Sequence, residues 1–199
     1  MNSKLITTVV ALGISAGVTA QSPAPAANVP DNLKPGANES VAFVVAAKGV
    51  QVYECRKAKD QTDTYEWTLV GPEADLFDAS GKKVGTHYAG PHWEATDGSK
   101  IVGVAKARAD APRPGAIPWL LLTAKSVGGP GSFSKITAVQ RLNTSGGVPP
   151  ETGCSQSEAG SIVRAPYAAD YYFLAVEDGS SSATKATTTP QAVPRGGYY

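Results

Sequence analysis

The chain has 199 residues, with 18 Lys or Arg and 17 Asp or Glu, which gives a formal net charge of +1. Removing residues 1–20 takes away Lys4 and no acid, so the remainder carries equal numbers of basic and acidic side chains. Proteins that bind nucleic acids usually present a basic stripe that neutralises phosphates. The balanced charge therefore argues against a nucleic-acid partner.

The first twenty residues have the pattern of a secretory signal peptide. Lys4 precedes an apolar run over residues 5–18, and the small residue Ala20 closes the segment. The run is interrupted by Thr, Ser and Gly and is shorter than the roughly 20 apolar residues that span a bilayer. We expect cleavage after Ala20, no membrane span in the mature chain, and export to the periplasm or the extracellular space.

Two further segments lack the composition of a folded core. Residues 21–38 form a Pro/Ala-rich linker, and residues 178–199 form a tail rich in Ser, Thr and Gly. Such segments bury too little apolar surface to offset the entropy of ordering them. We expect both to be flexible or disordered, and we expect a single folded domain over residues 39–177.

The domain has the sequence pattern of strands throughout. Apolar and polar residues alternate with a period of two, or form short apolar runs bounded by Gly and Pro. Expected strands and hairpins cover residues 40–47, 49–55, 65–70, 76–88, 92–107, 117–127, 133–142 and 170–176.

The turn-forming residues between these segments favour antiparallel pairing. Ser80-Gly81 and Asp97-Gly98 predict hairpin turns, because such residues tolerate a positive φ at low cost. Gly71-Pro72 is expected to end the strand 65–70. About nine short strands with this spacing predict an all-β fold, a single antiparallel β-sandwich or barrel-like domain.

Cys55 and Cys154 are the only cysteines in the chain. In an oxidising compartment two such thiols usually pair, so we expect a disulfide that closes a loop of about 100 residues. A reactive thiol is the alternative, but neither cysteine lies in a C-x-x-C motif and no base can be assigned to either.

Several long motifs carry a family resemblance. They include GVQVYEC (49–55), GKKVGTHYAGPHWEATDGS (81–99), IPWLLL (117–122) and GGPGSFSKITAVQRLNTSGGVPP (128–150). With them the chain resembles the secreted bacterial and fungal family catalogued as domain of unknown function 3455, over residues 41–176. Some members carry the label malate dehydrogenase. A dinucleotide site would need a G-x-G-x-x-G turn between a strand and a helix; Gly128-Gly129-Pro130-Gly131 lacks that spacing, and we reject the label here.

His87 and His92, the only two histidines, are candidate ligands for a small molecule or a transition metal, with Glu94 as an oxygen donor. Catalytic zinc generally takes three protein ligands, and His92 and Glu94 share a strand face from which Trp93 points away. The resemblance matches His87, in its G-x-H-x-x-G-P setting, better than His92. A hydrogen-bonded histidine at a strand end is the alternative reading of His87. No cofactor is predicted beyond this possible metal.

Other polar residues add one more candidate. Arg141 leaves a predicted strand toward a glycine-rich connection, where a binding loop or an ordinary turn are both open interpretations. The carboxylates Asp78 and Asp97 stand at predicted turns, which explains them without catalysis. Aromatic residues could stack on a glycan or form the core; they are Tyr53, Trp67, Trp93, Trp119, Tyr171 and Tyr172.

Three functions remain open from the sequence. The first is a non-enzymatic binding module for a small molecule, a glycan or an envelope surface, with His87, His92, Glu94 and Arg141 as candidate ligand-binding residues. The second is a metal-dependent, possibly redox, enzyme centred on His87. The third is a structural envelope protein. The sequence contains no G-x-S-x-G nucleophile motif, no dinucleotide-binding motif and no complete set of metal ligands.

Overall fold

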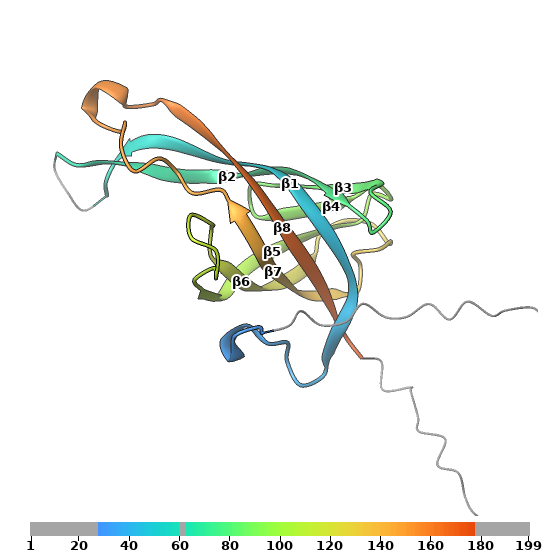
Figure 1. Ribbon diagram of the computed structural model, residues 1–199. Helices are drawn as coiled ribbons and strands as arrows, with labels where there is room; N and C mark the ends of the chain where they lie inside the picture. Colours follow the sequence, from blue (N-terminus) through green and yellow to red (C-terminus); the bar gives the residue numbers. More distant parts are fainter. Residues whose placement is uncertain (1–27, 60–62, 178–199) are drawn as a thin grey trace, which may run out of the picture.

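The computed structural model describes residues 28–59 and 63–177, and the signal peptide and the tail predicted above lie outside these ranges. Within them the protein is all-β, with eight strands and two short 3-10 turns, η1 (Asp31–Leu33) and η2 (Gln156–Glu158) (Figure 1). The strands are β1 (Glu39–Lys57), β2 (Tyr65–Phe77), β3 (Lys83–Tyr88), β4 (His92–Ala95), β5 (Lys100–Ala109), β6 (Trp119–Ser126), β7 (Ile136–Gly146) and β8 (Ile162–Val176).

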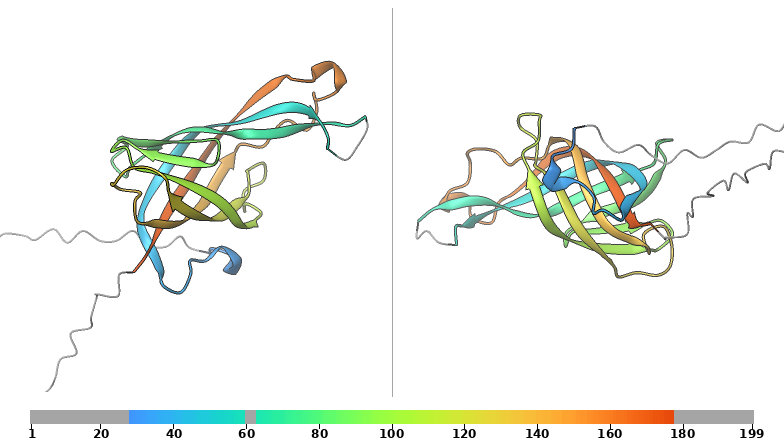
Figure 2. Two further views of the ribbon diagram at one scale, coloured as in Figure 1. Left: turned by 180° about the vertical axis from the view of Figure 1, so that it is seen from behind. Right: turned by 90° about the horizontal axis from the view of Figure 1, so that it is seen from below.

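The strands form one closed antiparallel barrel. Each strand pairs with the next along the chain, and β8 returns to pair with β1. Figure 2 shows the strands running around the barrel from behind and from below. The predicted all-β, single-domain antiparallel fold is confirmed, and of the two architectures expected the structure has the barrel rather than the sandwich.

Both predicted hairpin turns are confirmed, but several strand boundaries were wrong; β8, for example, begins at Ile162 and not at residue 170. Gly81 and Gly98 have φ values of 81° and 84°, in the left-handed region that favours glycine. Residues 40–47 and 49–55 are one continuous strand, β1, instead of two. Gly71 does not end β2: the strand bulges there against Val52 and Tyr53 and continues to Phe77.

Alternating side chains divide the barrel into an inside and an outside. The interior core is filled by aromatic and aliphatic residues from all around the barrel, among them Val45, Leu76, Trp93, Leu122, Val139 and Phe173. A second apolar cluster lies on the outer face of β6, β7 and β8 and includes Trp119, Leu121, Leu142 and Leu174.

The second cluster is covered by the segment just before β1. Leu33 in η1 is fully buried in it, and the Gln140 side-chain amide donates a hydrogen bond to the Leu33 carbonyl at 2.6 Å. Residues 28–38 were predicted to belong to a linker without packing, so this contact is a correction. The burial of Leu33 and the hydrogen bond from Gln140 to its carbonyl hold this segment against the barrel, although most residues of the segment favour turns.

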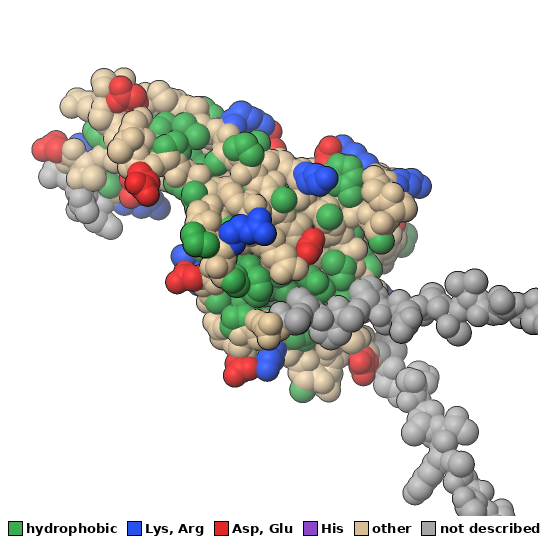
Figure 3. Space-filling view, in the orientation of Figure 1, with side chains coloured by type: hydrophobic (Ala, Val, Ile, Leu, Met, Phe, Trp, Pro, Cys, Tyr) green, Lys and Arg blue, Asp and Glu red, His purple; other side chains and the backbone are tan. Residues whose placement is uncertain are grey.

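Beyond the barrel, the end of β1 and the start of β2 run on as an arm, with the first residues of β8 beside them (Figure 1). The predicted disulfide between Cys55 and Cys154 is confirmed, and it ties the β7–β8 connection to the arm. On the face shown in Figure 3, acidic and basic side chains are interspersed. No helix in residues 28–59 or 63–177 is long and apolar enough to cross a membrane.

Candidate functional site: a pocket inside the barrel

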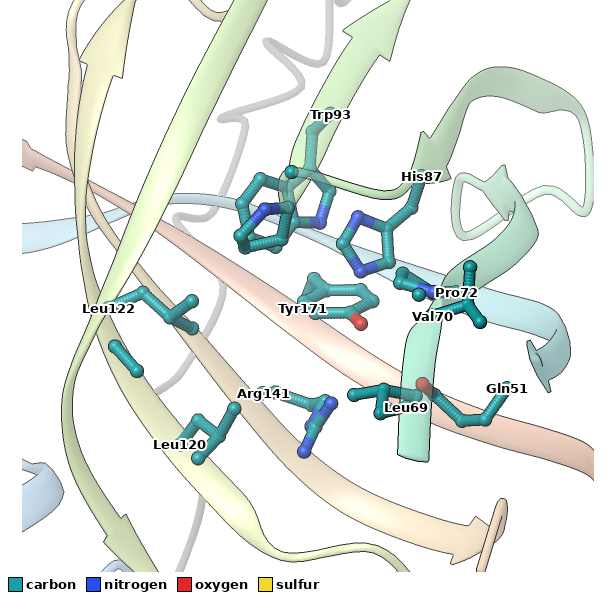
Figure 4. A pocket seen from close by; sticks show the side chains of 14 residues that line it. Gln51, Leu69, Val70, Pro72, His87, Trp93, Leu120, Leu122, Arg141 and Tyr171 are labelled. Carbon is teal, nitrogen blue, oxygen red and sulfur yellow. The ribbon is translucent and has the colours of Figure 1, made fainter. Parts of the chain in front are cut away.

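The barrel holds a pocket of about 240 Å³ to which all eight strands contribute (Figure 4). Its walls are mainly apolar, formed by Leu69, Val70, Pro72, Pro91, Leu120 and Leu122. Leu69 and Val70 on β2 remain 52% and 44% exposed, which places them at the mouth of the pocket. Five side chains supply its polar atoms: Gln51, His87, Trp93, Arg141 and Tyr171.

His87 lies inside the barrel because the register of β3 pairs it with Ala74 on β2 and Trp93 on β4, which also face inward. Its side chain is only 2% exposed. The imidazole stacks on the Trp93 indole and meets the edge of the Tyr171 ring, with centroid distances of 4.4 Å and 5.0 Å. The histidine is therefore held on two sides by aromatic rings.

The protonation of His87 follows from its surroundings. Its Nδ1 lies 2.7 Å from the carbonyl oxygen of His92, and since a carbonyl only accepts, Nδ1 carries the hydrogen. Burial lowers the pKa of His87 to about 3, although this hydrogen bond opposes the shift. The imidazole is therefore neutral near pH 7, and its Nε2 offers a lone pair.

Arg141 stands in the middle of β7, where the register places it between Leu120 on β6 and Tyr171 on β8. Its Nε and Nη2 donate to the carbonyl oxygen of Pro118 at 3.2 Å and 2.9 Å. Arg141 makes no ion pair with a carboxylate of the described residues. It is the only charged side chain that lines the pocket within the described chain.

Two side chains that line the pocket carry a buried donor without a protein partner. Gln51 Nε2 and Trp93 Nε1 reach no hydrogen-bond acceptor among the described residues, and both side chains are 1% exposed. The hydroxyl of Tyr171 lies 3.5 Å from that of Tyr167 and also has the Arg141 side chain as a polar neighbour. Burial raises the pKa of Tyr171, so its hydroxyl stays protonated and can donate. Unpaired buried donors cost free energy.

The other two candidate residues lie on the outside of the barrel. His92 stacks on Tyr88 and its Nδ1 contacts the Ala89 carbonyl at 2.8 Å. Glu94 accepts from the Tyr88 hydroxyl at 2.7 Å and pairs with Lys100 at 2.9 Å. These hydrogen bonds hold the pKa of Glu94 below its ordinary value.

The structure thus brings together two of the four predicted site residues, His87 and Arg141, and leaves His92 and Glu94 on the opposite face of the sheet. The proposed metal set of His87, His92 and Glu94 does not converge. In the part of the chain that the structure describes, no three His, Cys, Asp or Glu side chains are grouped so that they could hold a metal ion.

Arg141 was expected at the exit of a strand, but it lies within β7, which continues to Gly146. Gln51 and Tyr171 were not predicted as site residues. Gln51 could have been found, because it occupies a face of β1 that it shares with Tyr53 and Cys55, both buried. A polar residue on a core-facing position of a strand is the signal that was missed.

The lining of the pocket combines apolar walls with a few polar groups. Among the described residues around the pocket there is no carboxylate, thiol or Ser/Thr hydroxyl that could act as a nucleophile beside His87. The walls are apolar, and the polar groups are a guanidinium, a neutral imidazole, a phenol hydroxyl, an indole N–H and a side-chain amide. A mostly apolar concave site with a few convergent polar groups is the usual form of a small-molecule site.

Fold and site together define a closed antiparallel barrel with an interior pocket. The chain belongs to the family described as "Protein of unknown function (DUF3455)", whose profile matches residues 35–175. The match extends from just before β1 almost to the end of β8, so it covers the whole barrel. Searches of curated proteins and of solved structures return no match.

Proposed function

We propose that this protein is an exported, non-enzymatic binding module that holds a small molecule inside its barrel. The observation that carries the proposal is an apolar pocket in which the Arg141 guanidinium, without a carboxylate partner among the described residues, stands beside the polar groups of His87 and Tyr171. Such groups are costly in an empty protein and are the features by which a binding site fixes a ligand.

Binding of a small molecule is favoured over binding of a glycan on an aromatic face. Of the six aromatics considered above, Tyr53, Trp93, Trp119, Tyr171 and Tyr172 are buried. Trp67 is partly buried and donates its indole N–H to the Thr152 carbonyl at 3.1 Å. These six residues therefore offer no exposed stacking platform for a sugar chain.

Export is supported by the signal-peptide pattern together with the disulfide between Cys55 and Cys154. Disulfides persist in oxidising compartments and are rare in the cytosol. The proposal predicts that the mature protein begins at residue 21 and is recovered from the periplasm or the medium, which N-terminal sequencing of the secreted chain would test.

The binding proposal can be tested with a blocked pocket. Ala105 is exposed and lines the pocket, so Ala105→Trp should fill its mouth without disturbing the core. Val104, its neighbour, is 67% exposed and points to the other face of β5, so Val104→Trp is a matched control. Thermal shifts of the purified protein are measured against a panel of small neutral and anionic organic molecules.

We expect at least one compound to stabilise the parent protein and the Val104→Trp variant but not the Ala105→Trp variant. A ligand at about 100 times its dissociation constant should add about 2.7 kcal/mol to the free energy of unfolding. The proposal fails if no compound in the panel stabilises the parent, or if blocking the mouth leaves every stabilisation unchanged.

A further inference from the structure

We propose that the ligand is a small organic carboxylate, with its anionic head against Arg141 and its apolar body against the walls of the pocket. This inference rests on the proposed function and narrows it to one chemical class. It is carried by the charge, the donors and the size of the pocket, each of which points to the same kind of molecule.

Arg141 supplies the positive charge of the pocket. A guanidinium has five N–H donors, and the two bonds to the Pro118 carbonyl fix its plane without neutralising its charge. A partly buried cation is stabilised by an anion at hydrogen-bonding distance. The described chain supplies no carboxylate for Arg141, so the anion is expected to come from the ligand.

The donors around the pocket fit the same head group. Arg141 has N–H groups beyond those that bond the Pro118 carbonyl, and the Tyr171 hydroxyl stays protonated and can donate. An ionised carboxylate only accepts, with about four lone-pair sites, so it suits the N–H groups of Arg141 and the hydroxyl of Tyr171. Figure 4 shows the Arg141, Gln51 and Tyr171 side chains around the pocket.

The size of the pocket limits the rest of the molecule. Its volume of about 240 Å³ lies below the range of roughly 300–1,000 Å³ that is usual for drug-sized ligands. The walls next to Arg141 are formed by Leu120 and Leu122, and the stacked rings of His87 and Trp93 lie across from them (Figure 4). An aliphatic or aromatic body the size of a single ring fits this space, whereas a long-chain lipid does not.

The test compares acids with uncharged analogues of the same shape. Calorimetry on the purified full chain measures the affinities of benzoate against benzamide, phenylacetate against phenylacetamide, and hexanoate against hexanamide, at neutral pH. For at least one pair we expect the acid to bind about tenfold or more tightly, the ratio that corresponds to about 1.4 kcal/mol. Arg141→Gln keeps a donor for the Pro118 carbonyl but removes the charge, and should bring the acid to within about twofold of the amide.

Two further variants complete the design. Arg164→Gln makes the same substitution on the outer face of β8, where Arg164 pairs with Glu73, and should leave the preference for the acid unchanged. Arg141→Lys keeps a cation in the pocket and should keep the preference, so it replaces Arg141→Gln if that variant does not fold.

The outcomes separate this inference from the proposed function. If neutral compounds bind in the pocket and none of the acids binds more tightly than its amide, the carboxylate is excluded while the binding function stands. If an acid is preferred but Arg141→Gln keeps that preference, Arg141 is not the anchor and the inference is overturned. If the broad panel also fails to bind, the proposed function falls with it.

Discussion

The imidazole of His87 lies flat on the indole of Trp93, with ring centroids 4.4 Å apart and planes 12° from parallel. The two residues face each other in the register of β3 and β4, and both point into the barrel. The arrangement suits a neutral imidazole, because charging the ring would place an unpaired cation among aromatic side chains, near Arg141. The same contact that builds one wall of the pocket therefore makes the fold sensitive to acid.

The stability of the protein should fall as the pH drops below about 6.5 because of His87. Its folded-state pKa of about 3 lies below its ordinary value of 6.5, so the unfolded chain binds the proton first and stability is lost as the pH falls from the higher value toward the lower. Between about pH 7 and pH 5 the loss should be on the order of 2 kcal/mol. Denaturant unfolding at the two pH values measures it.

His87→Gln is the control for this prediction, because it removes the titrating group while keeping a polar side chain. The variant should be less stable at both pH values, but the difference between them should largely disappear. An equal pH dependence in the parent and the variant would show that other groups cause the acid sensitivity.

Most of the fold could be predicted from the sequence, because alternation and turn residues act locally. The hairpins at Ser80-Gly81 and Asp97-Gly98 needed only their own residues to be recognised. Gly71 was misread because a glycine within a strand can mark either its end or a bulge, and the choice depends on the partner strand. Closure of the barrel depends on the long-range pairing of β1 with β8, which no local pattern encodes.

The site was predictable only in part, for a related reason. Alternation showed that His92 and Glu94 share the face of β4 opposite the apolar Trp93, but it could not place His87, because both faces of β3 carry polar residues. His87 and Arg141 lie 54 positions apart in the sequence and meet only through the closed barrel. A hydrogen-bonded His87 was among the expected alternatives, and the bond to the His92 carbonyl agrees with it.

The disulfide between Cys55 and Cys154 should contribute strongly to stability, because it closes a loop with a sequence separation of 99. Chain-entropy arguments give up to about 4–5 kcal/mol for a loop of this length. The double variant Cys55→Ala/Cys154→Ala should lose a large part of that amount in denaturant unfolding. Thiol titration of the denatured, unreduced parent should find no free cysteine, and two free thiols would contradict the bridge.

Asp97 should matter more for stability than Asp78, although both sit at hairpin turns. Asp78 accepts hydrogen bonds only from its own turn, from Ser80 and Lys82. Asp97 bonds Ser99 in its own turn and also the backbone and hydroxyl of Ser132, at 2.7 Å and 2.6 Å, in the loop before β7. These bonds hold the pKa of Asp97 far below its ordinary value.

In thermal unfolding, Asp97→Ala should therefore lower the melting temperature by more than Asp78→Ala, because it releases a second segment of the barrel as well as a turn. Ser132→Ala should reproduce part of the loss caused by Asp97→Ala, since it removes one of the same hydrogen bonds. Equal losses for the two aspartate variants would mean that the link to Ser132 adds nothing to the fold.

Leu33 should behave as a core residue although it precedes the barrel. Leu33, the last residue of η1, is fully buried against the outer cluster of β6, β7 and β8. Truncating a buried leucine to alanine typically costs about 2–5 kcal/mol. Leu69 is the matched control, because it is 52% exposed and Leu69→Ala removes the same atoms from the mouth of the pocket. Leu33→Ala should lower the free energy of unfolding by at least about 2 kcal/mol and Leu69→Ala by less than about 1 kcal/mol. If the two variants prove equally stable, the segment before β1 does not contribute to the core.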